Sequence, residues 1–404
     1  MEPLFFPGNP QFWYETLRSL GHIAYGGADF GEVVTTVRRI SAGDYDGWHD
    51  EWLATADRVA AEGATALAGG HRVSARDAFL RASNYYRNAE FFLHGDPEDP
   101  RIRHAYDASV SCFRQAAALF TPAVEPVAIP YEDTVLPGYL YRADDSGTAR
   151  PTVVMHNGFD GTVEEMHFFG AAAAVERGYT VLAFDGPGQP GTRHHQGLTF
   201  RPDWENVVGP VIDHAVTIPE VDPARIALLG ASMGGLLAPR AAAFEHRVAA
   251  VIALDGVYDL GVITTSPIPG DRAEAERRLR AAHDPDLDAM LEAAMAGNPM
   301  VRWAIEHGMY VMGADTPRAF GAAYLDHHLR EGIAEKITCP TLVCAGADDG
   351  FFKGQPELLY EHLTCPKTLL EFGADQGADA HCQSGAQRLA FARVYDWLDD
   401  VFAA

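Results

Sequence analysis

The chain has 404 residues, 47% of them apolar, and a formal net charge of −25. This length accommodates a core of about 250 residues plus an additional element. The negative charge argues against nucleic-acid binding and against adhesion to anionic membranes, and the sequence offers no apolar stretch long enough to span a bilayer.

The first third of the chain has the pattern of helices. From Tyr45 to Ala68, apolar and small residues recur at helical spacing until a Gly-Gly pair interrupts them. A second helix is predicted to open at Ser74, with Asp77 in an approximate capping box, and a third should run to about Leu119. A small group of helices is not stable in isolation. We therefore expect residues 1–121 to form an N-terminal helical domain that packs on the rest of the chain.

Beyond this segment, short apolar strands alternate with helices. Strands are expected at 127–131, 136–142, 152–156, 180–184, 225–229, 248–254, 341–345 and 368–372, with helices near 165–176, 204–216, 234–244 and 385–402. Such a pattern indicates a mostly parallel sheet covered by helices on both faces. The pattern lapses at about 261–336, so residues 122–404 are predicted to form an α/β catalytic domain with a helical cap inserted there.

The central chemical signal is the pentapeptide Gly230-Ala-Ser232-Met-Gly234, which joins an expected strand directly to a helix of small residues. A nucleophile on a strained strand-to-helix turn needs glycines beside it, because side chains there would collide with the sheet and the helix. The pentapeptide alone is a weak signal in a glycine-rich chain. Its context between strand and helix makes Ser232 the candidate nucleophile.

A serine nucleophile needs a base, and the base needs a carboxylate that orients it. Of the 17 histidines, His381 alone lies in the loop after the last expected strand. Enzymes whose nucleophile sits on such a strand-to-helix turn carry their base in that loop. Two adjacent carboxylates, Asp348 and Asp349, follow the preceding strand. Enzymes with such a turn commonly show Gly-x-x-Asp after this strand, and that pattern favours Asp349. Asp255 and Asp259 follow the strand after the strand-to-helix turn of residues 230–234, called the elbow below, and they remain alternative candidates.

The oxyanion formed during attack needs preorganised N–H donors. One candidate is the backbone amide of Met233, directly after the nucleophile. The other should come from the loop after the strand 152–156, where we favour the amide of Phe159 over that of Asp160. The aromatic ring of Phe159 can also line the substrate pocket.

Other polar residues have simpler interpretations. Asp185 is expected to stabilise a turn. His194 and His195 look like metal ligands, but no partner has ligand spacing along the sequence, which favours a solvated loop. Cys382, beside His381, is expected to be a packed thiol and not a nucleophile. With five cysteines and no zinc spacing, and with no secretion signal at the amino terminus, we expect free thiols in a reducing cytoplasm.

Several stretches resemble one group of α/β-hydrolases. They are Asn157–Met166, Phe184–Gln189, the elbow, the Ala-His-Cys-Gln around His381, and the helical Ser74–Arg87. The group includes dihydroxypseudooxynicotine hydrolase of nicotine breakdown and the fungal polyketide-shortening hydrolases of pigment biosynthesis. One departure is Gln189-Pro190, where relatives often continue with a second glycine.

The resemblance implies an α/β-hydrolase fold with helices over the active site and a catalytic triad of Ser232, Asp349 and His381. It also implies no metal and no cofactor, often a homodimer, and cleavage of a carbon–carbon bond next to a ketone, although some relatives are esterases.

We therefore expect a cytoplasmic serine hydrolase of a small or medium organic carbonyl compound, and no nucleic acid or membrane as partner. Ser232 would attack, His381 would move the proton, Asp349 would orient His381, and the amides of Phe159 and Met233 would hold the oxyanion. Two alternatives stay open. One is an acyltransferase, lyase or cyclase that uses the same three residues and excludes water. The other is a non-catalytic binding protein built on this fold.

Overall fold

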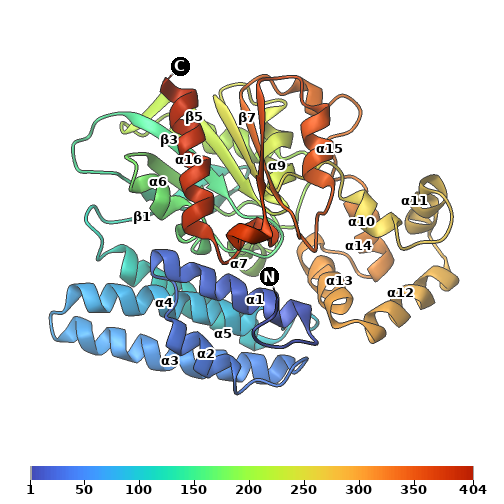
Figure 1. The fold of residues 1–404 in the computed structure, drawn as a ribbon, viewed down its shortest axis with the longest axis horizontal. Helices are drawn as coiled ribbons and strands as arrows, with labels where there is room; N and C mark the ends of the chain where they lie inside the picture. Colours follow the sequence, from blue (N-terminus) through green and yellow to red (C-terminus); the bar gives the residue numbers. More distant parts are fainter. Residues whose placement is uncertain (1, 404) are drawn as a thin grey trace.

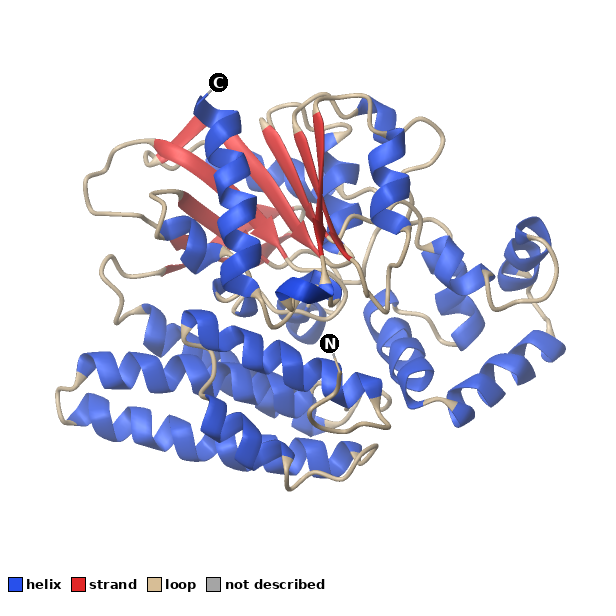
Figure 2. Cartoon of the chain, in the orientation of Figure 1, coloured by secondary structure: helices blue, strands red, loops and turns tan. Residues whose placement is uncertain are grey.

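The computed structural model of the chain describes residues 2–403, and Figure 2 shows the strands gathered beside a group of helices. Within these residues, a single sheet has eight strands in the order β1-β2-β4-β3-β5-β6-β7-β8. β2 pairs antiparallel with β1 and β4, and every other neighbouring pair is parallel, which confirms the mostly parallel sheet. The strands are β1 (Glu125–Tyr131), β2 (Thr134–Tyr141), β3 (Arg150–His156), β4 (Thr180–Phe184), β5 (Val221–Ala231), β6 (Ala250–Leu254), β7 (Thr341–Gly346) and β8 (Lys367–Phe372).

The central strands are apolar on both faces because helices cover both. In β3, Val153 and Met155 join one buried cluster, and Val154 between them joins the other. The first cluster includes residues of α6 (Ala171–Val175) and α16 (Gln387–Ala403), and α16 crosses the front of the sheet in Figure 1. The second includes residues of α8 (Glu205–Ala215), α9 (Gly234–Ala242) and α15 (Gln355–His362). Short helical turns complete the connections: α7 (Pro190–Gln196), η2 (Glu165–His167), η3 (Ala334–Lys336), η4 (Ala374–Gln376) and η5 (His381–Gln383).

One predicted helix is interrupted. The expected helix near 165–176 is a 3-10 turn, η2, followed by the short helix α6. Between them Gly170 adopts φ 121°, a conformation that residues with a Cβ avoid, so the helix cannot run through this position.

The N-terminal third is helical, as its periodicity predicts. It contains α1 (Pro10–Gly21), η1 (His22–Tyr25), α2 (Phe30–Val37), α3 (Tyr45–Ala68), α4 (Arg72–Glu90) and α5 (Pro100–Ala117). In Figure 1 these helices lie in layers below the sheet, and α1 is the layer nearest to it. The predicted start of α4 at Ser74 is too late, because the chain turns back into the helix directly after the Gly-Gly pair, with His71 at the N-cap and no side-chain cap bond.

The segment between β6 and β7 is a group of short helices beside the sheet (Figure 1). They are α10 (Gly261–Thr265), α11 (Arg272–Arg280), α12 (Pro285–Gly297), α13 (Pro299–Met312) and α14 (Pro317–Tyr324). Four of them begin at an N-cap residue whose side chain accepts a backbone N–H of the first turn. These N-cap residues are Asp271, Asp284, Asn298 and Thr316. Such N-caps satisfy the free donors of a helix start, which explains why this charged segment divides into several short helices.

Two further features follow from the side chains. All five cysteines are free, as their spacing predicts. Within residues 2–403, none of the helices combines the length and the apolar content needed to cross a bilayer.

The close approach of α9 to β5 gives a test of the packing. A Cβ on Gly230 would lie 2.0 Å from the carbonyl oxygen of Gly234, which is backbone and cannot rotate away. We expect Gly230→Ala to lower the free energy of unfolding by about 1–3 kcal/mol, measured by urea denaturation. The control is Gly297→Ala, where no atom lies within 4 Å of the new Cβ, and its effect should stay within about 0.5 kcal/mol. Equal stabilities of the two variants would show that the turn has more room than the structure gives it.

Candidate active site

Ser232 lies on the sharp turn between β5 and α9 with φ 60°, a sparsely populated conformation for a residue with a side chain. Its backbone N–H donates to the carbonyl of Leu254 on the neighbouring strand at 2.9 Å. Glycines let the surrounding backbone come close: a Cβ on Gly235 would lie 2.2 Å from the carbonyl oxygen of Asp255. The turn is therefore fixed from both sides and projects the Ser232 hydroxyl out of the sheet edge.

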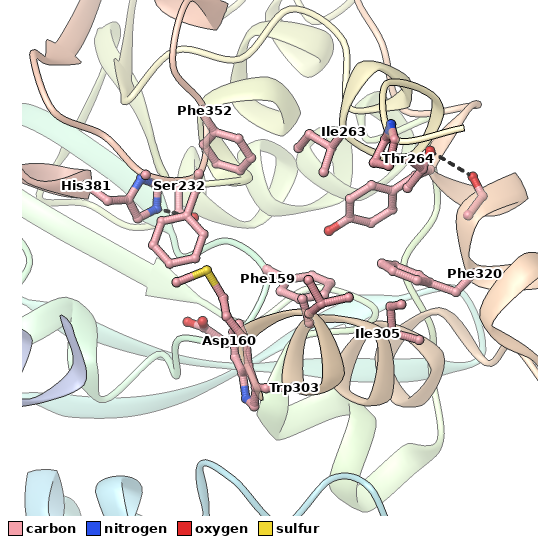
Figure 3. A pocket seen from close by; sticks show the side chains of 18 of the residues that line it. Phe159, Asp160, Ser232, Ile263, Thr264, Trp303, Ile305, Phe320, Phe352 and His381 are labelled. Carbon is pink, nitrogen blue, oxygen red and sulfur yellow. Dashed lines mark hydrogen bonds between the residues drawn. The ribbon is translucent and has the colours of Figure 1, made fainter. Parts of the chain in front are cut away.

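The structure brings Ser232, His381 and Asp349 together in one hydrogen-bonded row. His381 Nε2 lies 2.8 Å from Ser232 Oγ (Figure 3), and His381 Nδ1 lies 2.9 Å from Asp349 Oδ2. The other oxygen of Asp349 accepts the backbone N–H groups of Phe351 and Phe352 at 2.7 and 3.2 Å, which fixes the carboxylate. Its neighbour in the sequence, Asp348, is exposed.

A second carboxylate faces the same imidazole nitrogen. Asp255 Oδ2 also lies 2.9 Å from His381 Nδ1, and it accepts the backbone N–H of Cys382. Its other oxygen accepts an N–H of the Gln383 side chain at 2.9 Å. The other alternative acid, Asp259, lies outside this row, because its carboxylate pairs with Arg272 and Arg330 at 2.6 and 3.2 Å.

The two carboxylates control the protonation of the site. Burial alone would lower the pKa of His381, but Asp349 and the other surrounding groups outweigh burial and hold that pKa well above its usual value. Burial and the charge of Asp349 raise the pKa of Asp255, whereas the pKa of Asp349 is lowered because His381 and backbone N–H donors outweigh its burial. Burial also raises the pKa of the Cys382 thiol to about 12, so this sulfur, 3.7 Å from His381 Nε2, stays protonated at neutral pH.

Two backbone amides beside Ser232 are free to bind a ligand oxygen. Within residues 2–403, neither the N–H of Met233 nor that of Phe159 donates a hydrogen bond. The loop of Phe159 is pressed against the elbow, since a Cβ on Gly158 would lie 2.6 Å from the nitrogen of Met233. The side chain of Asp160 is engaged elsewhere, in an ion pair of 3.0 Å with Arg18.

A cavity of about 350 Å³ opens onto Ser232 and His381, and its walls are mainly apolar (Figure 3). The walls come from α1, from the loops after β3 and β7, and from the helices between β6 and β7. Lining side chains include Tyr14, Arg18, Phe159, Ile263, Ile268, Leu279, Met290, Leu291, Met300, Trp303, Ile305, Phe320, Tyr324, Phe351 and Phe352. An apolar cavity with few polar groups suits an organic molecule of small or medium size.

The resemblance implies helices over the active site, and α1 is one of them, although the helices expected from the periodicity begin only at Tyr45. The Tyr14 hydroxyl of α1 lies 3.3 Å from Ser384 Oγ and 3.4 Å from the carbonyl oxygen of His381, and therefore supports the loop that carries His381. The signal for this helix was present, because Asn9 caps its start and Pro10 occupies its first turn.

Buried charges join α1 to the loop that carries Phe159. The Arg18 guanidinium binds both oxygens of Glu165, with Nε at 2.7 Å from Oε1, and also reaches Asp160. Arg87 of α4 pairs with Glu15 at 2.9 Å beside it. Burial alone would raise the pKa of Glu165, but the two guanidinium groups outweigh burial and hold that pKa well below its usual value. The carboxylate therefore stays ionised in dry surroundings.

Two other sequence interpretations can be compared with the structure. Asp185 is buried and accepts the backbone N–H of Gly191 at 2.9 Å, as expected for a turn-stabilising carboxylate. The interpretation of His194 as part of a solvated loop is wrong. It lies in α7, half-buried, with Nδ1 at 2.7 Å from the Tyr310 hydroxyl, because its neighbours come from segments distant in the sequence. His195 is exposed and lies 3.0 Å from Asp107.

Comparisons with known proteins agree with this architecture. Residues 153–400 match the family described as "Alpha/beta hydrolase family", and residues 8–266 match "Esterase FrsA-like". The chain is 37% identical over 426 residues to "Hydrolase acrC" of Aspergillus aculeatus, with 98% of each chain covered. It is 36% identical over 408 residues to "20-hydroxy-prefusarin hydrolase FUS2" of Gibberella moniliformis, with 97% of this chain and 96% of that protein covered.

A solved structure shares the fold over nearly the whole chain. The crystal structure of the 2,6-dihydroxy-pseudo-oxynicotine hydrolase superposes with a TM-score of 0.73 at 22% identity, covering 94% of this chain and 95% of that one. The shared region thus includes the N-terminal helices as well as the sheet.

The buried ion pairs give a stability prediction. Arg18→Leu leaves Glu165 and Asp160 without their main counter-charge, and we expect a loss of about 3–5 kcal/mol in the free energy of unfolding at neutral pH. The loss should shrink as the pH falls below the usual pKa of a glutamate, because a protonated Glu165 needs no counter-charge.

The matched control is Arg58→Leu. Arg58 pairs with Glu62 on the surface, where both side chains are about half exposed (50% and 53%), and the change should cost no more than about 0.5 kcal/mol. Urea denaturation of both variants over a pH series measures the difference. A similar small cost at both arginines would contradict a structural role for the buried pair.

Proposed function

The chain belongs to the α/β-hydrolase family, and on that premise we propose that it is a serine hydrolase of small or medium organic carbonyl compounds. The observation that carries the proposal is the row Ser232 Oγ–His381 Nε2, 2.8 Å, and His381 Nδ1–Asp349 Oδ2, 2.9 Å, at the wall of an apolar cavity. A hydroxyl, an imidazole and a carboxylate in this order are the parts of a nucleophilic triad.

In the proposed reaction, His381 Nε2 accepts the proton of Ser232 Oγ as this oxygen attacks the substrate carbonyl. The resulting imidazolium is stabilised by Asp349, with Asp255 as a second negative group on the same nitrogen. The amides of Phe159 and Met233 donate to the oxyanion. His381 then protonates the leaving group, and a water molecule activated by the same imidazole hydrolyses the acyl-enzyme.

The bond cleaved is either a carbon–carbon bond next to a ketone or an ester. Both need the same nucleophile and oxyanion donors, and they differ in whether the proton goes to a carbon or to an oxygen of the leaving group. Of the printed names, only the family description "Esterase FrsA-like" specifies a bond type, whereas "20-hydroxy-prefusarin hydrolase" and "2,6-dihydroxy-pseudo-oxynicotine hydrolase" specify a compound. The apolar walls favour a β-diketone or an acyl-aromatic compound over a highly charged substrate.

The domain assignment follows the same reasoning. We assign residues 1–121 as a helical domain that closes one side of the cavity through α1, and about 261–336 as a cap that closes another. Residues 122–404 carry the reacting groups. This division supports a separation of roles, with chemistry on the sheet edge and selectivity on the helices.

Removal of the nucleophile tests the mechanism. Ser232→Ala should reduce kcat by about 10⁶-fold without unfolding the protein, because no other group in the row can attack the carbonyl. Turnover of paired aryl esters and β-diketones is measured for the wild type and the variant, with circular dichroism as the folding control. Covalent labelling by a fluorophosphonate should disappear in the same variant. Full turnover in a folded Ser232→Ala protein would rule the mechanism out.

The alternative of acyl transfer or cyclisation is tested with wild-type protein in ¹⁸O-labelled water. Hydrolysis places one labelled oxygen in the acid product, whereas transfer to another nucleophile does not. A product free of label would assign the protein to the acyltransferase, lyase or cyclase class. A protein that neither turns over a substrate nor reacts with a fluorophosphonate would be a binding protein.

A matched pair of variants distinguishes the contributions of Asp349 and Asp255 to catalysis. Asp349→Asn should lower kcat by a factor on the order of 10⁴, because the imidazole loses the group that selects its tautomer. Asp255→Asn should cost less, and should move the rise of kcat/KM with pH to lower pH. Loss of a negative charge beside His381 lowers its pKa, so the neutral, basic form appears at lower pH. If Asp255→Asn is the more damaging change, Asp255 is the acid of the triad.

A further inference from the structure

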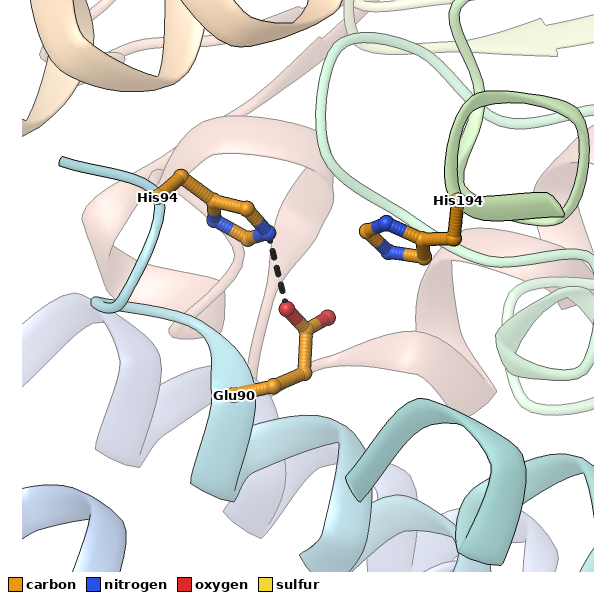
Figure 4. Close-up of side chains that lie close together, drawn as sticks. All are labelled: Glu90, His94 and His194. Carbon is orange, nitrogen blue, oxygen red and sulfur yellow. Dashed lines mark ion pairs between the residues drawn. The ribbon is translucent and has the colours of Figure 1, made fainter. Parts of the chain in front are cut away.

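A second cluster of ionisable side chains lies between the N-terminal helices and α7 (Figure 4). Glu90 is the last residue of α4, His94 lies one turn further along the chain, and His194 belongs to α7. One carboxylate oxygen of Glu90 and one ring nitrogen of each histidine lie within 4.8 Å of one another. Glu90 and His94 are almost completely buried, with 2% and 4% of their surface exposed.

The three facing atoms lack hydrogen bonds. Glu90 Oε2, His94 Nε2 and His194 Nε2 are each buried, and none has a hydrogen-bond partner within residues 2–403. Glu90 Oε2 and His94 Nε2 are only 2.9 Å apart, but this contact does not have hydrogen-bond geometry. Buried polar atoms without partners are costly, and three of them directed at one point call for an explanation.

The opposite nitrogens of both rings are occupied. His94 Nδ1 lies 3.2 Å from His307 Nδ1, and His194 Nδ1 lies 2.7 Å from the Tyr310 hydroxyl. His307 in turn donates from Nε2 to the carbonyl oxygen of Phe159 at 2.9 Å. With neutral rings, His307 Nδ1 is then an acceptor and His94 Nδ1 must be the donor, which turns the lone pair of His94 Nε2 toward the carboxylate of Glu90.

Glu90 Oε2, His94 Nε2 and His194 Nε2 face one another with no donor from the described residues between them, so they need a positively charged partner. An extra proton could bridge His94 and Glu90, but it would leave His194 Nε2 without a partner. A metal cation would satisfy all three atoms at once. Two imidazoles and a carboxylate form a donor set suited to Zn²⁺ and similar ions, and ligating histidines usually donate their other N–H to a polar group, as both rings can do here.

We propose that Glu90, His94 and His194 bind a divalent transition-metal ion, with Zn²⁺ as the best match. The ligands come from the end of α4, the loop after it and α7, so the ion would tie the N-terminal helices to the catalytic region. Through His94 and His307 of α13, it would also hold the peptide of Phe159. That link bears on the oxyanion donor of the proposed function, but metal binding itself is independent of it.

The test is metal binding by the full chain after removal of any purification tag. Chelator-stripped protein is titrated with Zn²⁺ in a calorimeter, and Co²⁺ is used as a spectroscopic substitute. We expect one equivalent per chain, a visible Co²⁺ spectrum of a four-coordinate nitrogen–oxygen site, and a higher thermal unfolding midpoint with Zn²⁺. Failure to bind a stoichiometric ion, with no effect of Zn²⁺ on unfolding, would leave the extra proton as the explanation and overturn the proposal.

Variants separate this site from adventitious binding. His194→Ala should weaken Zn²⁺ binding by more than 100-fold and Tyr310→Phe by about tenfold, because loss of a ligand costs more than loss of its hydrogen-bonded support. The matched control is His195→Ala, next in the chain and exposed, which should bind as the wild type does. Circular dichroism and fluorophosphonate labelling show whether each variant is folded. The site is refuted if His194→Ala and His195→Ala weaken Zn²⁺ binding equally, or if neither variant weakens it.

Discussion

The architecture depends on one backbone constraint, the left-handed conformation of Ser232 in a turn that has no room for neighbouring side chains. The turn redirects the chain from β5 into α9 with Gly230, Gly158 and Gly235 in close contact with other backbone atoms. Because it is held on every side, the turn fixes three things together: the hydroxyl, the free amide of Met233 and the neighbouring loop of Phe159. A site assembled from a rigid turn does not need reorganisation at the moment of reaction, which is the condition under which oriented dipoles contribute most.

The chain order of the motifs was sufficient to predict the sheet and the three residues of the row. Alternation of apolar strands with helices has a simple physical cause, burial of both sheet faces, and it therefore leaves a readable pattern. The interruption at Gly170 and the existence of α1 are not predicted from the sequence. A short helix with many polar residues on its buried side lacks the apolar stripe by which buried helices are recognised. Asp255 was only an alternative candidate. Sequence order cannot show that two loops deliver carboxylates to one nitrogen, and it cannot bring Glu90 and His194 together.

The two carboxylates beside His381 have two opposing effects on its proposed role as a base. In the proposed mechanism, two carboxylates beside the ring stabilise the imidazolium, which would favour the transition state of attack but would also make the ring harder to keep neutral beforehand. The pKa values of the two carboxylates are shifted in opposite directions. Backbone N–H groups and the imidazole keep the pKa of Asp349 low, while burial and its neighbour raise the pKa of Asp255. One carboxylate thus holds its charge more readily than the other, and the basicity of His381 depends on the balance between them.

The ion pairs under α1 have a consequence for how molecules enter and leave. A small displacement of α1 would separate Arg18 from Glu165 while both remained out of contact with water, and such a separation is expensive. The wall made by the helices between β6 and β7 presents Ile263, Leu291 and Met300 to the cavity, and its ion pairs, such as Arg318 with Asp288, are partly exposed. Moving α1 therefore costs more than moving these helices, because partly exposed ion pairs are weaker than buried ones. On the proposed function, we expect substrate and product to pass on the side of the helices between β6 and β7.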